Sequence, residues 1–158
     1  LDSAGIKCWA NINMIEKKYK FDLIRMNWSL EHVHSPKDYF NFISEHLNEN
    51  GTAFIMVPNN EGLLYKMNQN CLELPIHLYH FSLRDIENYA HKAELFIDDS
   101  VTFSYPEMYQ VAASNGLLSS KFRFAENISK AQKAMSFLEA VDEMGWGTDM
   151  IISLKKQM

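Results

Sequence analysis

Cysteine is scarce in this chain, with only Cys8 and Cys71 among 158 residues. The two lie far apart in sequence, so they show neither the spacing of a metal-ligand motif nor a disulfide framework. Such usage fits a reducing compartment, and we expect the cytoplasm. No apolar run approaches the ~20 residues that cross a bilayer, so we expect no membrane partner.

Excess positive charge is also lacking, because 15 Lys and Arg residues face 20 Asp and Glu residues, giving a net charge of −5. A nucleic-acid partner is therefore not expected. What the chain does have is a hydrophobic fraction of 47% and a charged fraction of 22%, as in globular domains. The length suits one domain with a sizeable core, and we expect residues 1–158 to form it.

The most informative stretch runs from Phe21 to Asn59. Phe21–Met26 is a short apolar run that predicts a strand, and a polar loop from Asn27 to His34 follows it. Ser35-Pro36 then predicts a helix start, because Ser caps free N–H groups and Pro is tolerated at the first helical position. Ala53–Val57 predicts a second strand.

Between those strands, Phe40, Ile43 and Leu47 recur at helical spacing and predict one buried stripe. Gly51 is expected to end the helix in a left-handed conformation. A strand–helix–strand crossover is right-handed, so the two strands should lie parallel in one sheet. Ligands of open α/β sheets bind outside the carboxyl ends of the strands, which directs attention to the loops after Met26 and Val57.

The remaining chain is read more coarsely. Segment Tyr105–Glu126 is undecided and resembles an insertion that covers the sheet. The last strand is expected to return antiparallel. The other predicted elements are a strand at Ile6–Trp9, helical turns within Asn59–Leu74, a helix capped by Ser82 with Asp85 as its capping-box partner, a strand at Leu95–Ser104, a helix at Asn127–Met144 and a strand at Asp149–Lys155.

Five short motifs occur in a meaningful order: FDLI, LEHV, an Asn-Gly turn before a strand ending in Val-Pro-Asn, PIHLYHFS, and GTDMIISLKK. This order resembles class I S-adenosylmethionine-dependent methyltransferases, and most of all their small-molecule group. The similarity covers Gly5–Ala93 well and Asp149–Lys156 loosely. It implies an α/β fold, a partial Rossmann-like sheet that is mostly parallel with an antiparallel last strand and has helices on both faces.

The chain departs from this family in one respect. The family holds its cofactor with a glycine-rich loop after its first strand, and no such loop precedes Phe21 here. We therefore expect a chain corresponding to the carboxy-terminal two-thirds of the domain. Phe21–Met26 would then be an exposed sheet edge, which predicts pairing with something, including a second copy. The alternative function is a non-catalytic domain used in oligomerisation or partner binding.

The resemblance implies methyl transfer from S-adenosylmethionine to oxygen or nitrogen of a small-molecule acceptor. By analogy, Met26 and Asn27 contact the methionine part of the cofactor, and Asn11 and Ile12 contact its adenine. Without the glycine-rich loop, we expect this chain to bind the cofactor weakly or not at all. A nicotinamide oxidoreductase is not favoured, because that class also needs a glycine-rich phosphate turn.

Glu31 and His32 form the sharpest candidate pair. In some relatives, such as quinone-biosynthesis O-methyltransferases and small-RNA end methyltransferases, a Glu-x-x-Glu-His motif binds a divalent ion. Here Trp28 stands at the first Glu position, so no metal is expected. His32 is instead a candidate general base, since imidazole titrates near neutrality. A structural histidine packed on the loop is an equally good interpretation.

The stretch before Ser82 supplies the last candidates. His77 is a second candidate catalytic base, and His80 is a candidate substrate contact. Trp28 and Tyr65 are candidates for the acceptor pocket. The alternative for all four is a structural aromatic cluster, which is the commoner use of such residues.

Overall fold

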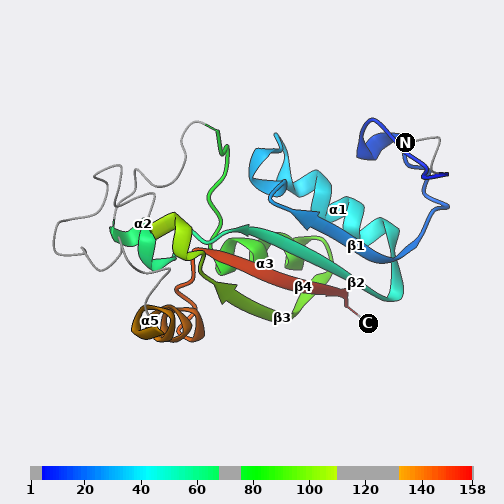
Figure 1. Ribbon diagram of the computed structural model, residues 1–158. Helices are drawn as coiled ribbons and strands as arrows, with labels where there is room; N and C mark the ends of the chain where they lie inside the picture. Colours follow the sequence, from blue (N-terminus) through cyan, green and yellow to red (C-terminus); the bar gives the residue numbers. More distant parts are fainter. Residues whose placement is uncertain (1–4, 68–75, 110–131, 158) are drawn as a thin grey trace.

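The computed structural model describes residues 5–67, 76–109 and 132–157 (Figure 1). Four strands form one sheet in the order β1-β2-β4-β3. Cys71 and most of Tyr105–Glu126 lie outside the described residues, so the expectations placed on them stay open. The strands are β1 (Phe21–Asn27), β2 (Leu47–Pro58), β3 (Leu95–Phe103) and β4 (Asp149–Lys156).

Strand directions confirm the predicted fold class. β1 and β2 pair in parallel, with Ile24 opposite Ala53 and Met26 opposite Ile55. β4 lies between β2 and β3 and pairs antiparallel with both. Three strands therefore point the same way, and the last strand returns against them, as the sequence predicted.

The helices are η2 (Ile12–Met14), η3 (Leu30–His32), α1 (Pro36–His46), α2 (Leu63–Met67), α3 (Leu83–Lys92) and α5 (Gln132–Glu143). α1 and α3 meet through stacked rings of Phe40 and Tyr89, whose centroids lie 5.3 Å apart. Together they cover one face of the sheet, against Ala53, Ile55 and Val57 of β2. None of the described helices is long and apolar enough to cross a membrane.

Two helix boundaries test the capping predictions. At α3 the predicted capping box is present, because the Ser82 hydroxyl accepts from the Asp85 N–H and the Asp85 carboxylate accepts from the Ser82 N–H. At α1 the Pro36 position is correct, but the Ser35 side chain makes no capping hydrogen bond. The proposed role of the Ser35 hydroxyl was therefore wrong.

Gly51 does not end α1. The helix stops at His46, Leu47 is already extended, and Gly51 lies buried inside β2. A Cβ on Gly51 would stand 3.0 Å from the Phe21 carbonyl oxygen and 2.9 Å from a Leu47 methyl group. This glycine is explained by close packing at the irregular pairing of β1 with β2, not by a left-handed turn.

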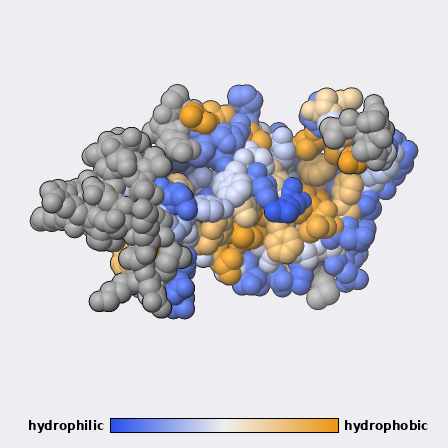
Figure 2. All heavy atoms as spheres, viewed as in Figure 1, coloured by the Kyte–Doolittle hydropathy of each residue, from blue (hydrophilic) through white to orange (hydrophobic). Residues whose placement is uncertain are grey.

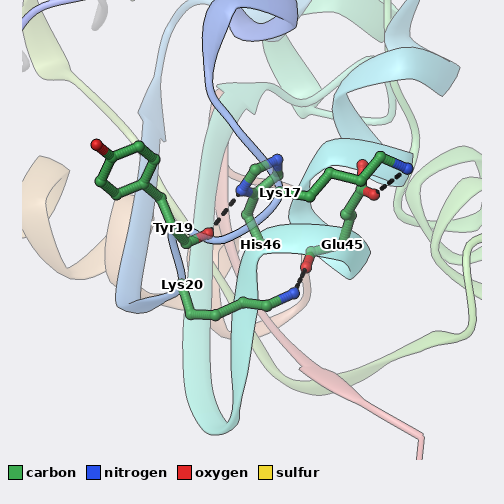
Figure 3. A network of polar contacts seen from close by, with 5 residues as sticks. All are labelled: Lys17, Tyr19, Lys20, Glu45 and His46. Atoms are coloured by element: carbon green, nitrogen blue, oxygen red, sulfur yellow. Dashed lines mark hydrogen bonds and ion pairs between the residues drawn. The ribbon is translucent and has the colours of Figure 1, made fainter.

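The predicted strand at Ile6–Trp9 is also absent, because these residues have no regular structure in the described chain. Instead, residues 17–20 are tied to the end of α1 (Figure 3). The Lys17 ammonium lies 2.6 Å from the Glu45 carboxylate, and Lys20 donates to the Glu45 carbonyl. His46 Nδ1 donates to the Tyr19 carbonyl at 2.8 Å. Because a carbonyl only accepts, Nδ1 carries the proton.

Among the described residues, the sheet face opposite α1 and α3 is open, so the prediction of helices on both faces is not met there. In Figure 1 α3 lies behind the sheet, and no described helix lies across the near face. Figure 2 shows apolar side chains over this face, interrupted by polar ones. The large exposed apolar residues there are Leu23, Phe54, Phe96 and Val101. β1 is also an edge strand, so both the face and the edge of the sheet are accessible in the described chain.

Candidate functional site

A pocket of about 370 Å³ opens where the strands end. Trp28 follows β1, Pro58 ends β2, Tyr105 follows β3 and Asp149 begins the antiparallel β4. The strand pairing places Pro58 opposite Asp149, and Asp149 opposite Phe103. All four strands thus contribute to one site at the edge of the sheet where α/β proteins bind ligands. The pocket is lined by Trp28, Glu31, His32, Pro58, Tyr65, His77, Tyr105, Met108 and Asp149.

Trp28 is held at this pocket by two hydrogen bonds. Its indole Nε1 donates to the Asp149 carboxylate at 2.8 Å, and its backbone N–H donates to the Met56 carbonyl at 2.8 Å. Its φ is 42°, in the left-handed region that a bulky residue rarely adopts. Strain of this kind persists where surrounding contacts impose it, and it is commonest at functional sites.

Asp149 is 3% exposed, and its second oxygen accepts from the Thr148 hydroxyl at 2.9 Å. Burial, and then the negative charge of Asp149, raises the pKa of the Tyr105 hydroxyl. A phenol is protonated at neutral pH even without this shift, so the Tyr105 hydroxyl can donate a hydrogen bond there. The Trp28 and Tyr105 rings lie 6.1 Å apart and form an aromatic wall of the pocket.

Two loops from distant parts of the chain carry the histidines. The loop after β1 contains Glu31 and His32 within η3, and the loop before α3 contains His77. The loops are joined by their backbones, because the N–H groups of Leu78 and Tyr79 both donate to the Glu31 carbonyl, at 2.8 and 3.2 Å. The positions of the histidines are therefore fixed by main-chain contacts.

Glu31 is fully buried, whereas 41% of the His32 side chain is exposed. His32 Nδ1 donates to the Ile76 carbonyl at 3.2 Å, and Nε2 lies 3.8 Å from the Glu31 carboxylate. The ring of His77 packs edge-on against that of His32, with centroids 4.9 Å apart. Ligand atoms of Glu31, His32 and His77 all lie within 4.8 Å of one another.

The structure brings four of the predicted site residues together. Trp28, His32, Tyr65 and His77 all line the pocket. His80 does not line it, although its ring lies 6.1 Å from that of His77. Their chemical roles stay predictions, because proximity alone does not assign them.

The predicted cofactor contacts are not brought together. Met26 and Asn27 end β1 beside the pocket, and the Asn27 side chain accepts from Arg25 Nε at 2.8 Å. Ile12 lies in a different hollow, with Phe42, Glu45 and His46 of α1. Asn11 caps the short helix η2 next to Ile12 by accepting from the Asn13 N–H. Among the described residues, the four predicted cofactor contacts therefore do not converge on one hollow, and their role stays a prediction.

Sequence reasoning missed Asp149, Tyr105 and Met108. Asp149 was assigned only as the start of a strand, yet it is the buried acceptor for Trp28. The available signal was its position: an acid at the start of an antiparallel strand lies beside the carboxyl ends of the parallel ones. Tyr105 and Met108 lie in the segment where no pattern was readable.

Comparison with known proteins gives a family and a set of structural neighbours. A family model described as "Methyltransferase domain" matches residues 3–99. No curated protein matches the sequence. This family match confirms the resemblance seen in the motifs.

Three solved structures illustrate the fold. An S-adenosylmethionine-dependent methyltransferase from Clostridium acetobutylicum has a TM-score of 0.55 at 16% identity, over 99% of this chain and 68% of its own. A putative sarcosine dimethylglycine methyltransferase from Galdieria sulphuraria has a TM-score of 0.56 at 18% identity, and the match covers 99% of this chain and 63% of that protein. A SAM-dependent methyltransferase from Archaeoglobus fulgidus has a TM-score of 0.51 at 16% identity, and the match covers 92% of this chain and 63% of that protein. The chain thus spans about two-thirds of the length of these neighbours.

Proposed function

Because this chain belongs to the methyltransferase-domain family, we propose that it transfers a methyl group from S-adenosylmethionine to oxygen or nitrogen of a small-molecule acceptor. The observation that carries the proposal is the pocket at the strand tips, which gathers Trp28, His32, Tyr65 and His77 from three separate segments. A volume of about 370 Å³ suits a small molecule. The neighbour from Galdieria sulphuraria is also named for small substrates.

Methyl transfer by in-line displacement depends mainly on alignment of donor and acceptor. In this proposal Trp28 and Tyr105 align the acceptor with their rings, and the Trp28 ring is itself fixed by Asp149. As the bond to the methyl group forms, the acceptor loses a proton. His32 receives that proton at Nε2, because Nδ1 is occupied in donating to the Ile76 carbonyl. His77 is the second candidate for this role.

On the cofactor side, Met26 and Asn27 at the end of β1 are the proposed contacts, and Asn11 and Ile12 are proposed only from the resemblance. The described residues do not enclose a cofactor by themselves. We accordingly expect weak binding of S-adenosylmethionine to the chain.

A transfer assay tests the proposal. The chain is incubated with S-adenosylmethionine labelled in its methyl group at millimolar concentration, together with panels of small alcohols, phenols and amines. We expect label in a small-molecule product, and a loss of at least about tenfold for Trp28→Ala, because the acceptor is then misaligned. Trp9→Ala, which changes a tryptophan outside the pocket, should retain activity. Label appearing in no small molecule, or equal loss in both variants, would contradict the proposal.

A second function is favoured by the open sheet, namely oligomerisation or partner binding without catalysis. β1 is an edge strand, and exposed Leu23, Phe54 and Val101 give the open face apolar character. Light scattering after size-exclusion chromatography tests it. If the edge pairs with a second copy, Leu23→Lys should shift the chain towards the monomer, whereas a monomer at all concentrations would exclude self-association.

A further inference from the structure

A second cavity, of about 380 Å³, shares no lining residue with the pocket at the strand tips. The two cavities are nevertheless neighbours along β4, because Asp149 lines the pocket at the strand tips and Met150 lines the second cavity. Successive residues of a strand point to opposite faces of the sheet, so one cavity lies on each side of β4. α2 and α5, which border the second cavity, lie at the end of the sheet toward which β3 points (Figure 1).

Exposed apolar side chains from two separate segments gather around this second cavity. Leu83 is the first residue of α3, whereas Met144 and Trp146 follow α5. Their exposed fractions are 38%, 53% and 43%, so folding leaves much of their apolar surface in contact with water. Met150, which belongs to the hydrophobic core, also lines the cavity. Apolar groups that converge on a cavity and stay exposed are typical of a ligand site.

The main chain of Trp146 is held in place, although its ring is exposed. Its N–H donates to the Val141 carbonyl at 2.9 Å, and its carbonyl accepts from the Leu63 N–H at 2.8 Å. The Asn59 side chain donates to the carbonyls of both glycines that flank Trp146, at 3.1 and 3.0 Å. The indole ring thus lines the cavity from a fixed backbone, which reduces the entropic cost of binding a ligand.

Three polar side chains at the second cavity have no hydrogen-bond or ion-pair partner in the part of the chain that the structure describes. They are the hydroxyl of Ser100, the carboxylate of Glu61 and the ammonium of Lys66. The Lys66 ammonium lies 5.9 Å from the centre of the Trp146 ring, where cation–π attraction favours its position beside the indole. One positive group, one negative group and one hydroxyl are therefore available to a ligand.

The two charged groups determine which kind of ligand the cavity favours. A molecule that carries only a carboxylate would pair with Lys66 but would be repelled by Glu61. A molecule that carries only an ammonium would pair with Glu61 and be repelled by Lys66. A zwitterion satisfies both groups, because each of its charges has an opposite charge to pair with.

We propose that this second cavity binds a free α-amino acid with an apolar side chain. The carboxylate of the ligand pairs with Lys66 and accepts from the Ser100 hydroxyl, and its ammonium pairs with Glu61. Its side chain packs against the exposed apolar groups, chiefly the rings and chains of Trp146 and Leu83. A volume of about 380 Å³ is within the range of small-molecule sites.

The test is a titration of the full ¹⁵N-labelled chain, followed through the indole N–H signals of its three tryptophans, Trp9, Trp28 and Trp146. Three probes share a phenyl ring and differ in charge: L-phenylalanine carries both charged groups, 3-phenylpropanoate only the carboxylate and 2-phenylethylamine only the ammonium. We expect saturable binding of L-phenylalanine with the largest shift at Trp146. The other two probes should bind at least about fivefold more weakly, because each loses one ion pair.

Two substitutions test the two ion pairs separately. Lys66→Met should weaken binding of L-phenylalanine by at least about fivefold without weakening that of 2-phenylethylamine. Glu61→Gln should weaken binding of L-phenylalanine without weakening that of 3-phenylpropanoate. The matched control is Lys37→Met, which removes an exposed lysine of α1 that lines neither cavity and should leave all three affinities unchanged. Circular dichroism establishes that each variant is folded.

The titration requires neither S-adenosylmethionine nor a methyl acceptor, so failure of this proposal is distinguishable from failure of the proposed methyl transfer. The proposal is overturned if no tryptophan signal shows saturable binding of L-phenylalanine at millimolar concentration, or if either singly charged probe binds as tightly as L-phenylalanine. It is also overturned if Lys66→Met or Glu61→Gln binds L-phenylalanine as tightly as Lys37→Met does. A largest shift at Trp28 would place the ligand in the pocket at the strand tips and would equally contradict it.

Discussion

Two histidines near opposite ends of β1 make the same kind of hydrogen bond, from Nδ1 to a backbone carbonyl, in different surroundings. His46 Nδ1 donates to the Tyr19 carbonyl, and His32 Nδ1 donates to the Ile76 carbonyl. His46 is 2% exposed and stacks on Phe42, with centroids 4.3 Å apart. The His32 ring instead lines a pocket, and its second nitrogen faces a buried carboxylate.

The comparison separates a structural role from a chemical one. At His46 the hydrogen bond joins Tyr19 to the end of α1, and the ring packs against Phe42 of the same helix (Figure 3). At His32 the hydrogen bond only orients the ring, and the remaining nitrogen is directed at the site. The region before β1 should therefore control stability, and the region after β1 should control binding.

The largest expected effect is that of His46→Ala on stability. The variant loses ring packing and a hydrogen bond inside the fold, so the free energy of unfolding should fall by about 3 kcal/mol. His32→Ala should cost less than about 1 kcal/mol, because 41% of its side chain is exposed. Urea denaturation measures both values, and equal losses would remove the distinction between the two ends.

Asp149→Ala should have the next largest effect. It removes the buried acceptor of the Trp28 indole and of the Thr148 hydroxyl, which should cost about 2 kcal/mol. Asp149→Asn keeps an acceptor oxygen and should recover most of the loss. The same denaturation measurement, together with near-ultraviolet circular dichroism of the tryptophans, checks this. If Asn were no better than Ala, the negative charge rather than the hydrogen bond would fix Trp28.

A smaller effect concerns two non-glycine residues of the described chain that have positive φ, Trp28 at 42° and Glu94 at 59°. Glu94 follows α3 in a position where glycine is favoured, so Glu94→Gly should stabilise the chain by up to about 1 kcal/mol. Trp28→Gly relieves similar strain but loses the bond to Asp149, and should be destabilising. Thermal unfolding shows whether each variant is stabilised or destabilised. If both were stabilised, the hydrogen bond to Asp149 would not be what holds Trp28 in its strained conformation.

The smallest expected effect is a pH dependence at the Lys17–Glu45 pair. The hydrogen bond from Lys17 lowers the pKa of Glu45 below its ordinary value of 4.5. A carboxylate with a lowered pKa in the folded state adds stability above 4.5, and that contribution is lost as pH falls through the folded pKa. Lys17→Met should flatten this part of the stability curve at low salt. No difference between the curves would mean that the pair contributes nothing measurable.

Much of the fold around β1, α1 and β2 was predictable, because Ser35-Pro36, the helical stripe and the apolar run before Pro58 are strong local signals. The end of α1 was not, because after its first residue, Leu47, β2 continues with the polar residues Asn48, Glu49 and Asn50 instead of an apolar alternation. Gly51 was then the nearest stop signal, although its actual constraint is contact with Phe21 and Leu47. Local patterns do not record such long-range packing.

The site was predictable where it depends on strand tips, as for Trp28 and His32. It was not predictable where it depends on tertiary pairing. The proximity of His77 to Glu31 follows from hydrogen bonds between two loops, and the role of Asp149 follows from insertion of β4 beside β2. The first relation has no signature in the residues alone, and the second could be inferred only from the position of Asp149 at the start of the predicted antiparallel strand.

The central claim is that ligands bind at the carboxyl tips of the strands and not at the other end of β1. The most direct test is a titration of the ¹⁵N-labelled chain with S-adenosylhomocysteine, followed by amide chemical shifts. We predict weak binding, with shifts at Met26, Asn27 and Trp28 and none at residues 17–20 or His46. Shifts centred on His46, or no shifts at the tip of β1 at millimolar ligand, would contradict the account.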